Sequence, residues 1–211
     1  MSVMQAEPTV YVVDDEPTIC DAISGLLAAR GMDSETFDSA EEFLDRYDIG
    51  VDRPGCLLLD IRMPGMSGLE LQRELRRREI GIPIIFLTAN ADVRTAVASL
   101  KGGATEYIEK PFQADSLLSA IDQAIEKDCQ TRGRTDELLK VRSRLATLSP
   151  REREVLDMVL DGVPTKNIAR ELGTSFETVK NQRSSILKKM HADNAVELAR
   201  VLTLLRVGGQ T

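Results

Sequence analysis

Short apolar runs alternate with helix-like patterns over the first 127 residues. Three of these runs have the length of a strand and are apolar throughout, which is typical of parallel strands buried on both faces. They are Val10–Val13, Cys56–Leu59 and Ile84–Leu87. Two weaker strands are predicted over Met32–Phe37 and Thr105–Ile108.

Between the runs, apolar residues follow helical spacing. Three groups carry this pattern: Ile19, Ala22, Ile23, Leu26 and Leu27; Val93, Ala96, Val97 and Leu100; and Leu117, Leu118, Ile121, Ala124 and Ile125. Glycines at Gly31, Gly81 and Gly102-Gly103 stand where helices are expected to stop. Five strand–helix units in alternation predict a doubly wound α/β domain over residues 1–127, with a five-stranded parallel sheet and right-handed crossovers.

The alternation ends near Lys127, and only helical signals follow. Residues 128–146 are polar and charged and predict a partly helical linker; Gly133 disfavours the alternative, an extension of the preceding helix. Ser149 to Glu152 form an S-x-x-E capping box with proline at the first helical position. Further helices are predicted over Thr165–Leu172, Ser175–Met190 and Asn194–Leu205, so residues 147–211 form a small all-α domain.

Charge divides the chain in the same way. The net charge is −7, but residues 1–128 hold 12 basic and 24 acidic residues, whereas residues 129–211 hold 15 basic and 10 acidic ones. An acidic half joined to a basic half is typical of a nucleic-acid-binding domain attached to a domain with another task.

Other classes of protein are disfavoured by what the sequence lacks. No apolar run approaches the roughly 20 residues that span a bilayer, and Met1 to Pro8 contain no signal-peptide core, so we expect a cytosolic protein without a membrane partner. Cys20, Cys56 and Cys129 are odd in number and widely spaced, which fits reduced thiols.

Chemistry-bearing residues follow the predicted strands. Asp14-Asp15 come after the first strand, Asp60 after the third, Thr88 after the fourth and Lys110 after the fifth. Ligands collect at the carboxyl edge of an open α/β sheet, and converging carboxylates there require a cation. Oxygen ligands of this kind suit Mg²⁺, or Mn²⁺. Asp60 is then the candidate nucleophile toward a phosphoryl group, with Lys110 neutralising charge and Thr88 donating a hydrogen bond.

These motifs resemble the receiver family over residues 8–127. They read V-D-D-E (Val13–Glu16), L-L-L-D-I-R-M-P-G-M-S-G-L-E (Leu57–Glu70), T-A-N (Thr88–Asn90) and K-P-F (Lys110–Phe112). The resemblance implies that Asp60 is phosphorylated by a partner histidine kinase. It also implies that Asp15, Asp60 and the Arg62 backbone carbonyl bind the metal directly, with Asp14 acting through water.

The same resemblance assigns further roles. It implies that Thr88 and Tyr107 are switch residues, that the Lys110-Pro111 peptide is cis, and that Arg62 and Asn90 tune the lifetime of the phosphoryl group. The chain would then be no enzyme beyond its own phosphorylation and dephosphorylation.

The basic domain has the pattern of a helix-turn-helix. Residues Ser175–Met190 present one exposed stripe, whose members are Glu177, Lys180, Asn181, Ser184 and Lys188. Candidate base readers are Lys180, Asn181 and Ser184. Candidate phosphate contacts are Lys166, Arg170, Thr178, Gln182, Arg183 and Lys188. Arg183 lies nearer the apolar flank, so packing along the helix is its alternative.

The strings L-S-P-R-E-R-E-V-L-D-M-V (Leu148–Val159), I-A-R-E-L-G-T-S and T-V-K-N resemble the LuxR-type helix-turn-helix domain over residues 147–207. A receiver followed by this domain resembles the NarL/FixJ subfamily of response regulators. The resemblance implies double-stranded DNA as a partner and a homodimer formed on phosphorylation or DNA binding. Asn181-Gln182 departs from the commonest family pattern, so the base preference does not transfer.

We hypothesise a two-state switch in which phosphorylated Asp60 draws Thr88 and Tyr107 inward and changes the surface of the helix over Asp92–Leu100 and the fifth strand. Two other readings remain: a phosphatase with an aspartate nucleophile, which the position of Asp60 on the third strand disfavours, and an output that is independent of phosphorylation or binds RNA.

Overall fold

The five predicted strands form one parallel sheet in the computed structural model, which describes residues 7–48, 53–89 and 103–207. The strands are β1 (Thr9–Val13), β2 (Asp33–Phe37), β3 (Gly55–Asp60), β4 (Ile84–Thr88) and β5 (Glu106–Glu109). Their order is β2-β1-β3-β4-β5. The direction of the strand order reverses between β1 and β3, which makes this point of the carboxyl edge the expected place for a ligand.

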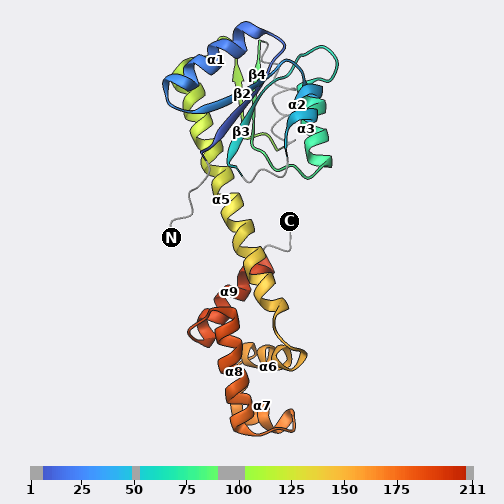
Figure 1. Ribbon diagram of the computed structural model, residues 1–211, viewed down its shortest axis with the longest axis vertical. Coiled ribbons are helices and arrows are strands. Elements are labelled where there is room, and N and C mark those ends of the chain that lie inside the picture. The colour runs from blue at the N-terminus through green and yellow to red at the C-terminus, as the bar shows by residue number, and fades with distance from the viewer. Residues whose placement is uncertain (1–6, 49–52, 90–102, 208–211) are drawn as a thin grey trace. The chain divides into compact units, whose positions relative to one another are not determined.

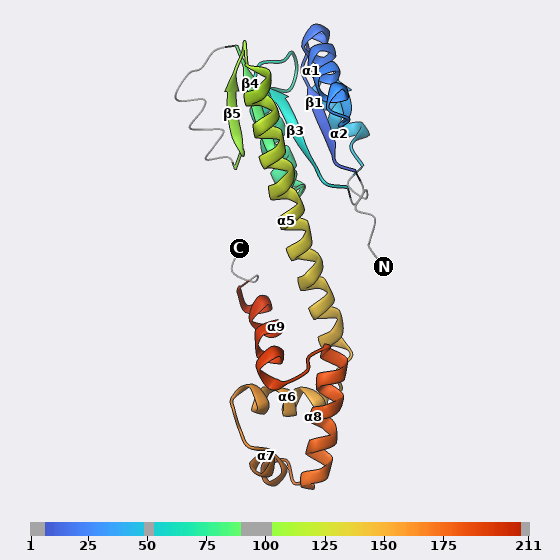
Figure 2. The same ribbon diagram turned by 90° about the vertical axis from the view of Figure 1, so that its left-hand side faces the viewer.

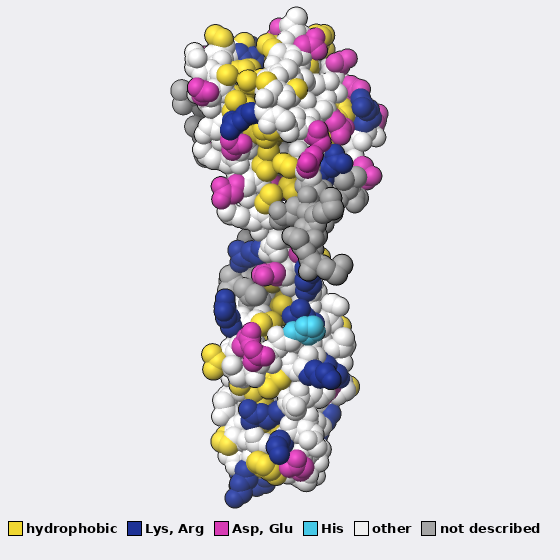
Figure 3. All heavy atoms as spheres, turned by 60° about the vertical axis from the view of Figure 1, so that its left-hand side comes forward, with side chains coloured by type: hydrophobic (Ala, Val, Ile, Leu, Met, Phe, Trp, Pro, Cys, Tyr) yellow, Lys and Arg dark blue, Asp and Glu magenta, His cyan; other side chains and the backbone are white. Residues whose placement is uncertain are grey.

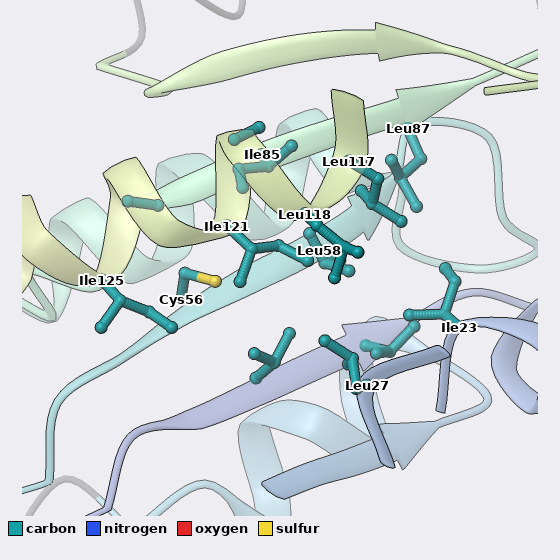
Figure 4. Packing of buried hydrophobic residues seen from close by; sticks show 14 of the residues in the cluster. Ile23, Leu27, Cys56, Leu58, Ile85, Leu87, Leu117, Leu118, Ile121 and Ile125 are labelled. Carbon is teal, nitrogen blue, oxygen red and sulfur yellow. The ribbon is translucent and has the colours of Figure 1, made fainter. Parts of the chain in front are cut away.

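Helices cover both faces of the sheet. α1 (Pro17–Ala29) and α5 (Ala114–Ala146) pack on one face, and α2 (Ala40–Arg46) and α3 (Gly68–Arg77) pack on the other (Figures 1 and 2). In Figure 4, Ile121 and Ile125 of α5 lie over Leu58 and Cys56 of β3, and Leu117 of α5 lies beside Leu87 of β4. The predicted doubly wound fold is confirmed.

The end of α3 corrects one prediction. We expected a helix to stop at Gly81, but α3 ends at Arg77, and Glu79 takes the left-handed conformation with φ 59°. The Ile80 amide then donates to the Leu75 carbonyl at 2.9 Å, and the Ile80 side chain packs against the core. This hydrogen bond and apolar contact close the helix as a glycine would. The predicted helix over Asp92–Leu100 lies outside the described residues.

The linker prediction also needs correction, because α5 continues without a break through Gly133 to Ala146. Glycine costs about 1 kcal/mol in a helix interior relative to alanine. Good helix formers on both sides of Gly133 outweigh that cost. The chain divides into two compact units, residues 1–132 and residues 133–211, and the boundary between them falls within the residue range of this helix.

The second unit is helical throughout its described part. Besides the end of α5, it contains α6 (Pro150–Leu160), α7 (Thr165–Glu171), α8 (Phe176–Met190) and α9 (Ala195–Val207) (Figure 2). Its core includes Val141, Val155, Ile168, Val179 and Leu198, so every one of these helices contributes. None of the described helices is both long enough and apolar enough to cross a membrane.

Glu152 joins the start of α6 to α8. The predicted capping box is present, because the Ser149 side chain accepts from the Glu152 amide and the Glu152 carboxylate accepts from the Ser149 amide. The same carboxylate also accepts from the Ser185 hydroxyl and the Lys189 ammonium, each at 2.7 Å. The hydrogen bonds from Lys189, Ser149 and Ser185 lower the pKa of Glu152 from 4.5 to about 2.

This shift predicts a pH-dependent contribution to stability. Since the pKa of Glu152 is lower in the folded state, its contribution is fully present above about pH 4.5 and is lost as the pH falls toward 2. We expect Glu152→Gln to reduce the free energy of unfolding of the helical unit by about 2 kcal/mol at pH 7. Calorimetric unfolding over this pH range measures the difference.

Glu154→Gln is the matched control. Glu154 lies on the same helix, its side chain is 54% exposed, and it pairs with the nearby Arg151. An exposed pair of this kind contributes little. Equal losses in the two variants, or a Glu152→Gln difference that persists unchanged below pH 4.5, would contradict the assignment.

Candidate functional site

Three charged side chains meet at the carboxyl edge of the sheet. The Lys110 ammonium, just after β5, lies 2.5 Å from Oδ2 of Asp14 and 2.9 Å from Oδ1 of Asp60. Asp14 follows β1 and is fully buried, whereas Asp60 ends β3 and is 6% exposed. One ammonium therefore bridges two buried carboxylates from neighbouring strands. The sequence predicted that these three residues meet at this edge, but with a metal ion as the cation between the carboxylates.

Backbone amides fix the other oxygens of these carboxylates. The Glu16 amide donates to Oδ1 of Asp14 at 3.1 Å, and the Arg62 amide donates to Oδ2 of Asp60 at 2.6 Å. The Lys110 amide donates to the Thr88 carbonyl at 2.6 Å, which ties the end of β5 to the end of β4. The expected cis peptide at Lys110-Pro111 is confirmed.

Burial and hydrogen bonding shift the pKa of Asp14 in opposite directions, and the same is true of Lys110. Burial raises the pKa of Asp14, and this effect outweighs the hydrogen bonds from Lys110 and Glu16 that favour the carboxylate. Burial alone would lower the pKa of Lys110, but the hydrogen bonds to Asp14 and Asp60 outweigh it and raise the pKa. Lys110 therefore stays positively charged beside the candidate nucleophile.

The oxygen-rich site differs from the predicted cluster of three carboxylates. Asp15 is exposed, and among the residues described no group of three or more His, Cys, Asp or Glu side chains is gathered closely enough to hold a metal ion. The cation between Asp14 and Asp60 is the Lys110 ammonium. The donor set still fits a hard divalent cation, since each carboxylate offers oxygen ligands and each of its oxygens accepts only one of the hydrogen bonds described above.

Three of the remaining predicted residues of the sheet unit, Thr88, Tyr107 and Arg62, are among those the structure describes. Thr88 is 2% exposed and ends β4. Tyr107 is half-buried on β5, pairs with Phe86 in the register and packs against the core beneath α2 and α3. The Arg62 side chain is exposed. Asn90 lies outside the described residues.

Two positioning features were missed by the sequence reasoning. Gly68, the first residue of α3, lies so close to β3 that a Cβ there would be 2.2 Å from the Asp60 carbonyl oxygen. In the loop between β3 and α3, the Met66 amide donates to the Glu41 carboxylate of α2 at 2.9 Å. Gly65 in the same loop has φ 75°, and a Cβ on it would collide with that carboxylate. Both glycines stand in the quoted P-G-M-S-G motif, which was the available signal.

In the helical unit, α8 presents most of the predicted DNA-contact residues to solvent. Seven of the nine candidates are exposed: Lys166, Arg170, Thr178, Lys180, Asn181, Ser184 and Lys188. Figure 3 shows one face of the molecule, on which Lys and Arg side chains are spread over the helical unit. The exposed stripe along α8 therefore takes no part in the core, to which α8 contributes Val179, Ile186 and Met190.

The other two candidates are half-buried. The Arg183 guanidinium donates to the Thr165 hydroxyl at 2.6 Å and so links α8 to α7, which favours the packing alternative for this residue. Oε1 of Gln182 is buried without a hydrogen-bond partner in the part of the chain that the structure describes.

Comparisons with known proteins identify a family for each of the two units. The family described as response regulator receiver domain matches residues 10–122, and the family described as bacterial regulatory proteins, luxR family, matches residues 146–202. The chain is 38% identical over 200 residues to the response regulator protein TmoT of Ectopseudomonas mendocina, covering 95% of this chain and 90% of that one.

Two further similarities extend over nearly the whole chain. Transcriptional regulatory protein FixJ of Rhizobium meliloti (strain 1021) is 40% identical over 194 residues, or 92% of this chain and 94% of FixJ. The solved low-resolution structure of response regulator StyR has a TM-score of 0.87 at 38% identity and covers 94% of this chain and 99% of its own.

The close approach at Gly68 generates a prediction. We expect Gly68→Ala to destabilise the sheet unit by about 1–3 kcal/mol, because its Cβ would collide with the backbone that carries Asp60. Gly25→Ala is the control: Gly25 lies on the exposed face of α1 with nothing within 4 Å of a Cβ, and we expect a gain of about 1 kcal/mol. Calorimetric unfolding of the two variants measures both effects, and equal stability would contradict the geometry.

Proposed function

The chain belongs to the two-component response regulators of the NarL/FixJ type, transcriptional regulators with a receiver domain and a LuxR-type DNA-binding domain, and from this premise we propose that phosphorylation of Asp60 controls dimerisation and DNA binding. The observation that carries the proposal is the bridge from Lys110 to Asp14 and Asp60 at the switch point of the sheet.

Asp60 is the proposed phosphoacceptor. A carboxylate oxygen of Asp60 forms a bond to the phosphorus of a phosphohistidine on the partner kinase, and the bond from phosphorus to the histidine nitrogen breaks with its electron pair. Lys110 holds a positive charge beside the transferring group, and such reactions depend mainly on positioning and electrostatics. The raised pKa of Lys110 supports this role.

Asp14, Asp15, Asp60 and the Arg62 carbonyl are the residues that would hold Mg²⁺ or Mn²⁺. A bound divalent cation supplies further positive charge to the phosphoryl oxygens. The Arg62 amide and the Lys110 ammonium orient the two oxygens of Asp60. Arg62 and Asn90 are the positions proposed to tune the lifetime of the acyl phosphate.

Thr88 and Tyr107 are the proposed switch residues. A phosphoryl group adds about −1.5 to −2 charge, and the Thr88 hydroxyl, at the same edge, would donate a hydrogen bond to it. Tyr107 is half-buried on the neighbouring strand, so a change in its packing would alter the surface of β5. Coupling of about 1–3 kcal/mol between the two domains is typical of such switches.

On the output side, we propose that α8 lies in the major groove of double-stranded DNA. Lys180, Asn181 and Ser184 would read base edges, and Lys166, Arg170, Thr178 and Lys188 would contact phosphates. All seven side chains are exposed, which supports these roles. Gln182 and Arg183 remain candidate phosphate contacts, although Arg183 already bonds Thr165.

One prediction concerns phosphorylation of Asp60. We expect the wild-type protein to gain one phosphoryl group from acetyl phosphate and Mg²⁺, and Asp60→Ala to gain none, as measured on a phosphate-affinity gel. EDTA should also abolish the gain. Asp45→Ala, which alters an exposed carboxylate on α2, is the control and should behave as wild type.

The same proteins test the switch. Treated wild type should dimerise or bind DNA more tightly, by about 5- to 150-fold, and Asp60→Ala should not respond. If Asp60→Ala is phosphorylated, or binds and dimerises like the treated wild type, the proposed function is wrong.

Another prediction separates base readers from phosphate contacts. We expect Lys180→Ala to weaken binding to the preferred duplex by about 1–3 kcal/mol and to relax specificity at one base position. Lys166→Ala should weaken binding to all duplexes similarly and reduce the salt slope by about 1. Lys140→Ala, an exposed site on α5, is the control. Titrations of duplex DNA and RNA at several salt concentrations make the measurement, and a preference for RNA would contradict the proposal.

A further inference from the structure

One phenylalanine departs from the others in its surroundings. Phe37, Phe43 and Phe86 are at most 1% exposed, and Phe112 packs against the core beneath α1 and α5. Phe176 is 54% exposed and belongs to none of the three core clusters formed by the described residues. About half of the Phe176 side chain is therefore accessible at the surface and available for a contact outside the core.

The position of Phe176 in α8 suggests what that contact is. Ser175 is the N-cap of α8, its hydroxyl accepting from the Thr178 amide at 3.0 Å, so Phe176 is the first residue of the helix. Side chains of a helix lean toward its N-terminus, and the ring therefore lies at the leading end of α8. Lys180, one turn later, shares its face and is exposed.

The surroundings of the ring at this end are suited to an uncharged contact. Ser175 and Thr178 are exposed and bonded to each other through their hydroxyls at 2.7 Å. The neighbouring charges, Glu177 and Lys180, pair with each other at 3.3 Å. The leading end of α8 thus offers one apolar group beside the candidate base readers.

We propose that Phe176 is a specificity residue that packs against the 5-methyl group of a thymine. This inference rests on the proposed function, in which the N-terminal part of the recognition helix contacts base edges in the major groove. In that groove, thymine is the base that presents a methyl group, and an apolar side chain is the group that reads it. Phe176 thus adds an apolar reader to the polar readers Lys180, Asn181 and Ser184.

The experiment begins with selection of preferred duplexes from a random pool by the full-length wild-type protein, with and without acetyl phosphate. Each thymine of the preferred half-site is then replaced in turn by deoxyuridine, which removes only the methyl group. We expect wild type to lose about fourfold in affinity at one thymine of the half-site, the value of one buried methyl. Phe176→Ala should bind the thymine duplex about fourfold more weakly and should not distinguish it from the deoxyuridine duplex.

Two further variants serve as controls, one that keeps an apolar side chain at position 176 and one that removes an exposed apolar side chain elsewhere. Phe176→Leu keeps an apolar side chain and should retain the preference for thymine. Leu139→Ala removes the 55% exposed leucine on α5 and should leave binding unchanged. Unfolding curves of Phe176→Ala and wild type should coincide, because the ring packs in no core cluster.

The outcomes distinguish the inference from its premise. If Phe176→Ala loses equal affinity for thymine and deoxyuridine duplexes, so that the difference between these duplexes persists, the ring contacts the DNA backbone or another protein surface and the inference is overturned. If wild type binds duplex DNA but responds to no single deoxyuridine, this inference alone is overturned. If wild type binds no duplex in either state, the proposed function fails and the inference fails with it.

Discussion

Two carboxylates buried side by side repel each other and lose their hydration, and both effects oppose folding. The Lys110 ammonium makes this arrangement possible at the edge of the sheet, since it lies within hydrogen-bond distance of both Asp14 and Asp60. The cost is only partly offset, because burial still raises the pKa of Asp14. In the proposed function, Lys110 and a bound divalent cation would together offset the negative charge that a phosphoryl group adds at this site.

The framework around this site holds the carboxylates in place through backbone contacts. Gly68 allows the start of α3 to press against the carbonyl of Asp60, and the Arg62 amide fixes the second oxygen of the carboxylate. In the helical unit, Glu152 plays a comparable part, since one carboxylate joins the start of α6 to two residues of α8. The recognition helix is thus held from its buried side, which leaves its other side to the solvent and, in the proposed function, to DNA.

Much of the sheet fold and of the candidate site could be predicted from the sequence. The apolar strands end in the residues that carry the chemistry, and parallel strands place those ends at one edge of the sheet. The exposed position of Asp15 could not be predicted, since the motif does not show which of two adjacent carboxylates turns inward. The end of α3 was misjudged because Gly81 was the expected helix stop, whereas the residue that takes the left-handed conformation there is Glu79. Gly133 was given too much weight against its helix-forming neighbours, and the bond from Arg183 to Thr165 joins helices whose packing the pattern does not specify.

Of the two carboxylates that Lys110 contacts, Asp60 is the one proposed to take up the phosphoryl group. Borohydride reduces an acyl phosphate of aspartate to homoserine, so reduction of the phosphorylated protein followed by peptide mass spectrometry identifies the modified residue. If Asp60 is the phosphoacceptor, homoserine appears at position 60 and nowhere else. Homoserine at position 14 or 15, or a phosphorylated protein that yields no homoserine, would contradict it.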